Sequence, residues 1–207
     1  MKLFDLTDEQ GVILVKLARQ VMESHLDENV YPETQVNDVT LNEKCGVFVT
    51  LSLHEGNYGL RGCIGVPYPV KPLIEAVVKA AQSAAFHDPR FPPLQASELS
   101  TVVIEVSVLT PPEVIQVTNR DSLVEQVKVG RDGLIVERNW SKGLLLPQVA
   151  VDWGWDSAEF LNQCCVKAGL PENSWLEPDT LVYRFQAILF KEEEPEGKVI
   201  RRIIEGE

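Results

Sequence analysis

The sequence lacks the features of a membrane-spanning or secreted protein. None of its apolar runs approaches the roughly 20 residues that a transmembrane helix needs. Its first ten residues, MKLFDLTDEQ, have neither the basic nor the apolar region of a signal peptide. We therefore expect a cytoplasmic protein with no membrane contact. A chain of 207 residues, 44% of them hydrophobic, is long enough to bury a core without disulfides or metal.

Positive charge is also scarce. The chain has 19 lysines and arginines against 31 aspartates and glutamates, which gives a formal net charge of -12. The only adjacent basic pair is Arg201-Arg202, and it lies in an acidic C-terminal stretch that we take as a tail spanning residues 191–207. Binding to a phosphate backbone depends on clustered lysine and arginine. The composition therefore argues against a nucleic-acid partner.

Metal-ligand and disulfide patterns are missing as well. The four cysteines, at positions 45, 63, 164 and 165, form neither a C-x-x-C pair nor a Cys/His ladder. Cys164 and Cys165 are neighbours in a predicted helix, where their side chains point about 100° apart and cannot readily bridge. We expect reduced thiols, no metal and no cofactor.

Local patterns predict helices mixed with antiparallel hairpins. Thr7 and Gln10 form a capping box at the start of a long helix, and Asp156 caps a later helix that ends at Gly169. Further helices are predicted at 71–86 and 121–127. Strands are predicted at 46–53, 58–65, 101–109 and 181–190, with a second hairpin around Asp132-Gly133. This mixture predicts an α+β fold of mainly antiparallel sheet with packed helices.

The hexapeptide LRGCIG (60–65) is the first candidate site. Alternation along a strand places Arg61, Cys63 and Gly65 on one face and Leu60, Gly62 and Ile64 on the other. A guanidinium two residues from a thiol lowers the thiol pKa, which would favour a reactive Cys63. The alternative is structural: the glycines fit a crowded sheet, and Arg61 pairs with a carboxylate.

Other polar or aromatic residues offer candidate roles. Glu105 shares one face of the strand 101–109 with Ser107, and it is a candidate partner for Arg61. His87 is the best placed of the three histidines to act as a base toward Cys63. The tryptophans cluster in the second half of the chain, where they line a pocket or pack in the core: Trp140, Trp153, Trp155 and Trp175.

A series of motifs then resembles the AMMECR-type domain family. LRGCIG, DPRFPPL, IEVSVLTPPE, VGRDGLIV, LLLPQVA and YRFQAILF follow one another in the order typical of that family. The resemblance covers roughly residues 6–190 of what we take as a single domain, 1–207, and it indicates a microbial member. It implies two unequal lobes with a cleft between them near LRGCIG, and a shared modification pathway with Memo-like and radical-SAM proteins.

The resemblance also carries over characteristic residues by position. Those of the proposed catalytic set are Cys63, Arg61 and Glu105. Those proposed for binding are Gly62, Gly65, Asp88, Arg90, Ser107 and Gln148. Pro89, Phe91 and Cys165 belong to the same motifs, whereas His87 does not, which weakens a Cys–His dyad.

Two hypotheses follow, and the sequence leaves them open. In the first, the protein is an enzyme or catalytic subunit that binds a small polar or peptide-like substrate. Cys63 would be a nucleophile or a thiol ligand, Arg61 would bind an anion or lower the thiol pKa, and Glu105 would orient Arg61 or move protons. In the second, the protein is a non-catalytic module that binds a partner protein, and Cys63 is merely small enough to fit.

Overall fold

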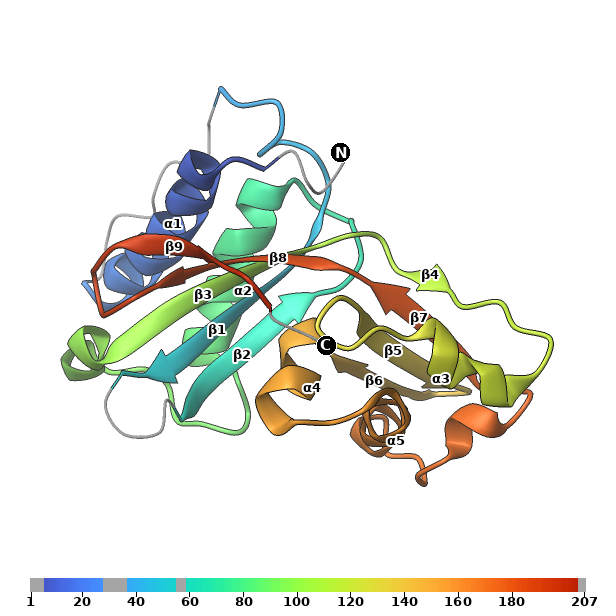
Figure 1. Cartoon of the computed structure of the whole chain (residues 1–207). Helices are drawn as coiled ribbons and strands as arrows, with labels where there is room; N and C mark the ends of the chain where they lie inside the picture. The colour runs from blue at the N-terminus through green and yellow to red at the C-terminus, as the bar shows by residue number, and fades with distance from the viewer. Residues whose placement is uncertain (1–5, 28–36, 55–58, 205–207) are drawn as a thin grey trace. The chain divides into compact units, whose positions relative to one another are not determined.

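The computed structural model describes residues 6–27, 37–54 and 59–204, and it confirms the α+β fold. The chain divides into two compact units (Figure 1). Unit 1 comprises Met1–Pro111 and Ile188–Arg202, and unit 2 comprises Pro112–Ala187 and Ile203–Glu207. The predicted cleft between lobes stays a prediction. Within the described ranges, no helix has both the length and the apolar character needed to span a bilayer.

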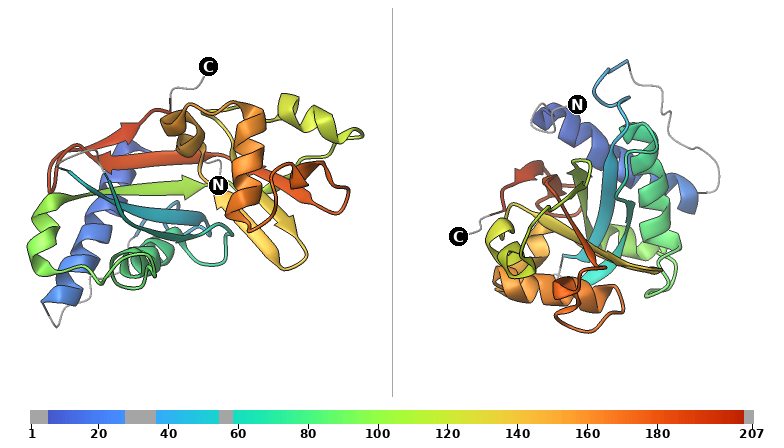
Figure 2. Two further views of the ribbon diagram at one scale, coloured as in Figure 1. Left: turned by 90° about the horizontal axis from the view of Figure 1, so that it is seen from below. Right: turned by 90° about the vertical axis from the view of Figure 1, so that its right-hand side faces the viewer.

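Unit 1 is a five-stranded sheet covered on one face by two helices. The strand order is β2-β1-β3-β8-β9, so β2 and β9 form the edges. The strands are β1 (Gly46–Leu53), β2 (Leu60–Val66), β3 (Val102–Leu109), β8 (Ala187–Glu192) and β9 (Val199–Arg202). The helices α1 (Asp8–Leu26) and α2 (Leu73–Phe86) lie on the same side of this sheet (Figure 2, left). The opposite face of the sheet is therefore not covered by α1 or α2 (Figure 2, left).

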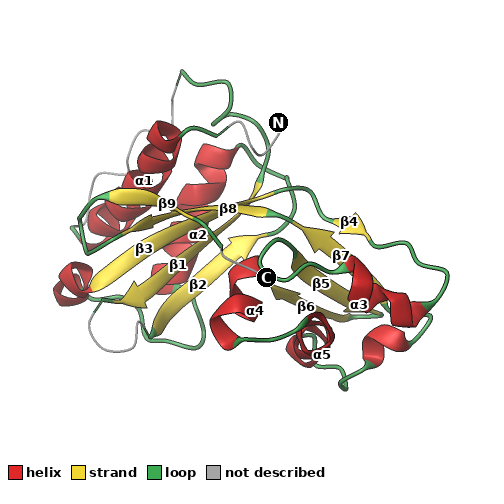
Figure 3. Ribbon diagram, viewed as in Figure 1, coloured by secondary structure: helices red, strands yellow, loops and turns green. Residues whose placement is uncertain are grey.

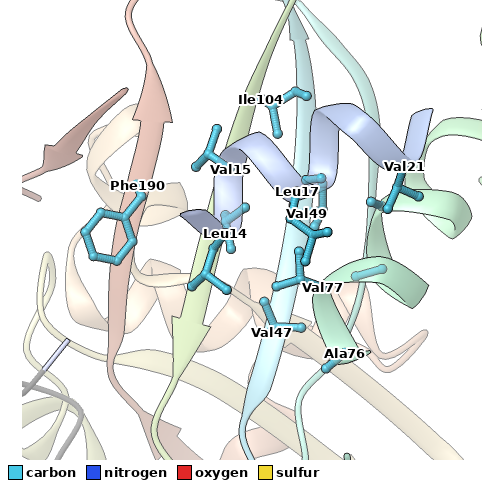
Figure 4. Packing of buried hydrophobic residues seen from close by; sticks show 14 of the residues in the cluster. Leu14, Val15, Leu17, Val21, Val47, Val49, Ala76, Val77, Ile104 and Phe190 are labelled. Atoms are coloured by element: carbon cyan, nitrogen blue, oxygen red, sulfur yellow. The ribbon is translucent and has the colours of Figure 1, made fainter. Parts of the chain in front are cut away.

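The core of unit 1 follows from the alternation predicted for β1 and the periodicity of α1. Val47 and Val49 are fully buried and face the helices, where Leu14 and Val77 join the same cluster (Figure 4). Leu51 is fully buried in that cluster as well. The capping box at Thr7 and Gln10 is present and fixes the start of α1. Burial of this apolar stripe holds the helices on the sheet and leaves alternate residues of β1 on the other face.

The C-terminal stretch differs from the predicted acidic tail. Residues 191–192 complete β8, and β9 pairs with it antiparallel, so six residues of this stretch belong to the sheet. Glu192 is buried because the Arg19 guanidinium of α1 donates to its carboxylate at 2.7 and 2.6 Å. The main-chain N–H of Ile104 donates to the same carboxylate at 2.9 Å. Glu192 is therefore a structural acid, and a count of charges cannot distinguish it from the exposed acids of this segment.

Unit 2 is a four-stranded sheet with its own helices (Figure 3). The strand order is β4-β7-β5-β6, from β4 (Glu113–Val114), β7 (Leu181–Phe185), β5 (Gly133–Arg138) and β6 (Ser141–Leu145). The helices are α3 (Leu123–Gln126), α4 (Pro147–Trp153) and α5 (Ser157–Lys167). Phe160, Leu161 and Cys164 of α5 are fully buried with Leu134 and Val136 of β5. Asp156 caps α5 as predicted, because its carboxylate accepts the Glu159 N–H.

Two strand predictions were wrong in detail. The hairpin of unit 2 does not turn at Asp132-Gly133, where β5 begins. It turns at Asn139-Trp140, and Asn139 takes the left-handed φ of 53° that a tight turn requires. The predicted strand 181–190 is two strands, β7 in the sheet of unit 2 and β8 in the sheet of unit 1. A single polar residue, Gln186, separates them, so the sequence shows almost no break.

Candidate functional site

The LRGCIG motif forms β2, at one edge of the unit 1 sheet. Its pairing with β1 is regular from Val66 to Gly62 and then slips by one residue, so that Leu60 lies opposite Ser52 and Arg61 has no partner residue. The strict alternation predicted for this motif therefore ends at Arg61. Such bulges interrupt a strand and redirect its side chains, and they are frequent beside functional sites.

Arg61 is buried and binds a carboxylate that the sequence did not indicate. Its Nε and Nη2 donate to Glu98 at 2.7 and 3.0 Å, and Nη2 also donates to the Pro92 carbonyl at 3.0 Å. The predicted pairing of Arg61 with Glu105 was therefore wrong. Glu98 comes from the 3-10 turn Ala96–Thr101, which brings its side chain to the sheet edge. The hydrogen bond from Arg61 lowers the pKa of Glu98.

The third guanidinium nitrogen of Arg61, Nη1, differs from the other two in having no acceptor within the ranges that the structure describes. Nη1 is screened from solvent and has no hydrogen-bond partner among the described residues, although 7% of the residue is exposed. A buried, charged donor without an acceptor costs more free energy than an ordinary hydrogen bond returns, and such groups need an explanation. The site therefore contains one strong donor that its own contacts leave unused.

Asp88 and Arg90 close the edge of β2 at Cys63. The Cys63 N–H donates to Asp88 at 2.9 Å, and Arg90 Nη2 donates to the Cys63 carbonyl at 3.1 Å. Arg90 also binds Asp88 at 2.7 Å, and its hydrogen bonds hold the pKa of that carboxyl well below its usual range. The two side chains thus satisfy the peptide groups that a neighbouring strand would otherwise pair.

The Cys63 thiol lies beside a hydroxyl rather than a base. Thr50 of β1 is its cross-strand neighbour, and the Thr50 hydroxyl donates to Sγ at 3.3 Å. Burial raises the pKa of Cys63, and this outweighs the hydrogen bond from Thr50 and the charge of Arg90, which both lower it. His87 is exposed, and its Nδ1 lies 3.3 Å from the Gln82 carbonyl. These contacts favour a protonated thiol at neutral pH.

Glu105 continues the same polar row across the sheet. Thr50 pairs with Cys63 on one side and with Glu105 on the other, so these three residues lie side by side on adjacent strands. Arg202 of β9 donates to Glu105 at 3.1 Å. Ser107 and Gly65 flank Phe48 in the next row, and Ser107 is fully buried. Glu105 thus has a structural partner from the last strand of the chain.

The glycines of the motif allow close contacts. A Cβ at Gly62 would lie 2.2 Å from the Ala84 carbonyl of α2, and one at Gly65 would lie 2.2 Å from the Val47 carbonyl of β1. Both distances are far below van der Waals contact, so the backbone packing requires glycine at both positions. Their role in this structure is to let β2 approach its neighbours.

The structure places some predicted residues together and others apart. Seven lie in the LRGCIG strand, the loop after α2 or β3 of unit 1: Arg61, Gly62, Cys63, Gly65, Asp88, Arg90 and Glu105. Ser107 lies one row further along β3, whereas Gln148 and Cys165 are buried in α4 and α5 of unit 2. Within the described ranges, no group of three or more His, Cys, Asp or Glu side chains has a metal-binding arrangement.

Three residues of the site were not predicted from the sequence: Thr50, Glu98 and Arg202. For Glu98 a signal existed, because Gln95 and Glu98 have capping-box spacing and Glu98 accepts the Gln95 N–H at 2.8 Å. For Thr50, the register of β1 against β2 would have been needed. Arg202 was hidden because the segment that carries it resembled a solvated tail.

The fold and site define an α+β protein whose characteristic hexapeptide forms a bulged edge strand, and the DPRF loop is tied to it by hydrogen bonds of Asp88 and Arg90. The AMMECR1 family profile matches residues 15–190. The chain belongs to the AMMECR1 family.

Similar proteins come from archaea. Protein TK0174 of Thermococcus kodakarensis is 50% identical over 203 residues, which cover 97% of this chain and 98% of that protein. A protein of Methanothermobacter thermautotrophicus is 52% identical over 195 residues, covering 93% of this chain and 100% of its own. The crystal structure of the uncharacterized protein PH0010 from Pyrococcus horikoshii is 49% identical and has a TM-score of 0.92. That match covers 96% of this chain and 98% of the other.

Proposed function

We propose that this protein is a binding module that recognises a neutral, peptide-like group at the bulge of β2, with Arg61 Nη1 as the donor. The observation that carries this proposal is the buried Nη1 atom without an acceptor. A carbonyl oxygen placed beside it would complete the hydrogen bonds of the guanidinium.

The charge balance of the site favours a neutral ligand over an anion. Each guanidinium of the site is paired with a carboxylate: Arg61 with Glu98, Arg90 with Asp88 and Arg202 with Glu105. These charges cancel within each pair, so the unused donor of Arg61 does not carry an unbalanced charge. An amide or peptide carbonyl satisfies such a donor without adding a charge that must be desolvated.

Binding requires a covering group to move, because Nη1 is itself screened from solvent. We assign this movement to Phe91, whose ring lies near the guanidinium. Its half-buried ring lies 5.9 Å from the Arg61 guanidinium carbon and 5.5 Å from that of Arg90. The adjoining peptide of Cys63 is already paired with Asp88 and Arg90, so the ligand does not add a strand there.

The catalytic alternative, with Cys63 as a nucleophile, has less support. A nucleophilic cysteine needs a lowered pKa, and burial raises the pKa of Cys63 instead. Arg61, the predicted activating group, is paired with Glu98. A place in a modification pathway with Memo-like and radical-SAM proteins is compatible with either role, because a binding module can present a peptide to a separate enzyme.

The test uses N-acetylglycinamide, a neutral peptide-like probe, and N-acetylglycinate, its anionic counterpart. Each is titrated into nitrogen-15-labelled protein while the Arg61 Nε–H and Cys63 N–H signals are followed. We expect the neutral probe to shift both signals and to bind more tightly than the anion. Arg61→Lys should weaken binding by about tenfold, which corresponds to about 1.4 kcal/mol.

Arg138→Lys is the matched control, because Arg138 pairs with exposed Asp179 in unit 2 and should not affect binding. Thermal unfolding of each variant shows that it is folded. Equal affinity of the Arg61→Lys variant and the unaltered protein would contradict the proposal. Tighter binding of the anionic probe would contradict the neutral ligand class.

A further inference from the structure

Unit 2 contains a cavity of about 580 Å³ that the proposed function does not use. All of its lining residues lie in unit 2: Val124, Val127, Lys128, Val129, Ala150, Val151, Gly154, Trp155, Asp156 and Ser157. They come from α3, the segment after it, the end of α4 and the start of α5 (Figure 1). Small-molecule sites in proteins commonly have volumes of roughly 300–1,000 Å³.

A glycine places an aromatic ring in this cavity. Helix α4 ends at Gly154, which has a φ of 66° and open space where a Cβ would lie. This left-handed turn brings the rings on either side of it together, and Trp153 stacks on Trp155 with centroids 5.9 Å apart and planes 18° from parallel. Trp155 lines the cavity, whereas Trp153 is 71% exposed. Trp155 therefore contributes an aromatic ring to the wall, and the stacked Trp153 supports that ring from outside the lining.

Most polar groups of the lining are already engaged, and Lys128 is the exception. The Ser157 hydroxyl donates to the Val127 carbonyl at 3.0 Å, and Asp156 accepts the Glu159 N–H at 2.8 Å as the cap of α5. The main-chain N–H of Lys128 donates to Asp132 at 2.9 Å, which fixes its backbone. Its ammonium group makes no hydrogen bond or ion pair with any residue that the structure describes. Lys128 is also the only cation of the lining.

From this arrangement we propose that the cavity binds a small amphipathic carboxylate. The carboxylate would bind the Lys128 ammonium, and the apolar body would lie against Trp155, Val124 and Val127. The valines and Trp155 make part of the wall apolar, and a ligand with an apolar body can lie against them without burying an unpaired polar group. The single unpaired cation sets the preference for an anionic head over a cationic one.

Three probes that share the same aromatic ring separate the contribution of the charged head from that of the apolar body. Phenylacetate, benzyl alcohol and benzylamine share a benzyl body and carry an anionic, a neutral and a cationic head. Each is titrated into the nitrogen-15-labelled full chain while the Trp155 indole N–H and the Lys128 main-chain N–H signals are followed. We expect phenylacetate to bind tightest and benzylamine weakest. The indole signal of Trp140, which is fully exposed, should not move.

Two variants test the proposed roles of the Lys128 ammonium and of the apolar wall. Lys128→Met should weaken phenylacetate binding by up to about fivefold and leave benzyl alcohol unchanged. A fivefold loss corresponds to about 1 kcal/mol, the upper end for an exposed charge pair. Lys167→Met is the matched control, because Lys167 is an exposed lysine of α5 outside the cavity lining. Val124→Phe fills part of the cavity and should weaken all three probes.

The outcomes distinguish the proposal from its alternatives. Tighter binding of benzylamine would overturn the carboxylate class and favour Asp156 as the polar contact. Equal effects of Lys128→Met and Lys167→Met would overturn the role of Lys128. Shifts confined to residues outside the lining would overturn the cavity itself. Every lining residue belongs to unit 2, so none of these outcomes bears on Arg61.

Discussion

Two arginines of unit 1 are equally buried and differently satisfied. Arg19 and Arg61 are 6% and 7% exposed. Arg19 binds Glu192 with two nitrogens, and it donates to the carbonyls of Leu99 and Val102 at 3.0 and 2.8 Å. Each of its three nitrogens therefore has an acceptor. Arg61 also binds a carboxylate and a carbonyl, but its Nη1 has no acceptor in the described part of the chain.

This difference is the basis for the binding role that we propose for Arg61 and for the structural role of Arg19. Arg19 joins α1 to β3 and β8, and burial does not prevent Glu192 from raising the pKa of its guanidinium. Arg61 lies at a bulge on an edge strand, and its Nη1 has no acceptor among the described residues. A buried donor left without a partner is unfavourable for stability, and on this ground we propose that it takes part in binding.

The largest effect is expected from removing the acid of the structural pair. Glu192→Ala leaves the Arg19 charge buried and unpaired, and this should lower the free energy of unfolding by about 3–5 kcal/mol. Glu98→Ala likewise removes the carboxylate partner of Arg61. Because the Glu98 side chain is 30% exposed, water can replace it, and we expect the free energy of unfolding to fall by only about 1–3 kcal/mol. Urea denaturation of both variants measures this. A larger effect at Glu98 would reverse the comparison.

The second-largest loss of stability is expected from disturbing the packing of β2 against α2 beside the bulge. Gly62→Ala would place a Cβ 2.2 Å from the Ala84 carbonyl, a main-chain atom that cannot rotate away. We expect a loss of about 1–3 kcal/mol as α2 shifts. Gly59→Ala is the control, because nothing lies within 4 Å of its Cβ position. Similar unfolding midpoints for the two variants would show that β2 and α2 do not depend on this contact.

Acid should weaken the edge of β2. The pKa of Asp88 in the folded protein lies below its value in the unfolded chain, so the stability it contributes is present above the unfolded value, about 3.9, and is lost as the pH falls below it. Asp88→Asn should remove this part of the pH dependence. Thermal unfolding between pH 7 and pH 3 measures it. An unchanged pH profile in the variant would contradict a stabilising role for Asp88.

The smallest effect expected is in the reactivity of Cys63. Because burial raises its pKa, alkylation at neutral pH should be slower than that of a free thiol and should increase only at alkaline pH. Peptide mapping separates Cys63 from the three buried cysteines, of which Cys45 and Cys164 have pKa values raised to about 11 and about 12. Rapid, pH-independent alkylation of Cys63 near pH 7 would instead support the catalytic alternative.

Much of the fold could be predicted from local patterns, and the details of the site could not. Thr7 and Asp156 act on helices within three residues of themselves, so their roles are visible in the sequence. The slip at Arg61 depends on how β2 meets β1, and alternation alone carries no sign of it. The predicted partner of Arg61 was wrong for the same reason, because Glu98 reaches it from a turn rather than from a paired strand.

Long-range pairing explains the remaining errors. Glu105 and Arg202 are far apart in the sequence, and only the addition of β9 to the sheet brings them within 3.1 Å. The run 181–190 keeps an apolar pattern through Gln186, although it crosses from one sheet to the other. Packing decides which sheet a strand joins, and a continuous apolar run in the sequence does not show where one strand ends and the next begins.

The central claim is that Arg61 Nη1 is a binding donor, and a high-resolution crystal structure of the protein soaked with N-acetylglycinamide tests it most directly. We predict a carbonyl oxygen of the probe within hydrogen-bond distance of Nη1, with the Phe91 ring displaced and the Arg61–Glu98 pair kept. An ordered water bound to Nη1, with the probe absent from β2, would contradict the claim.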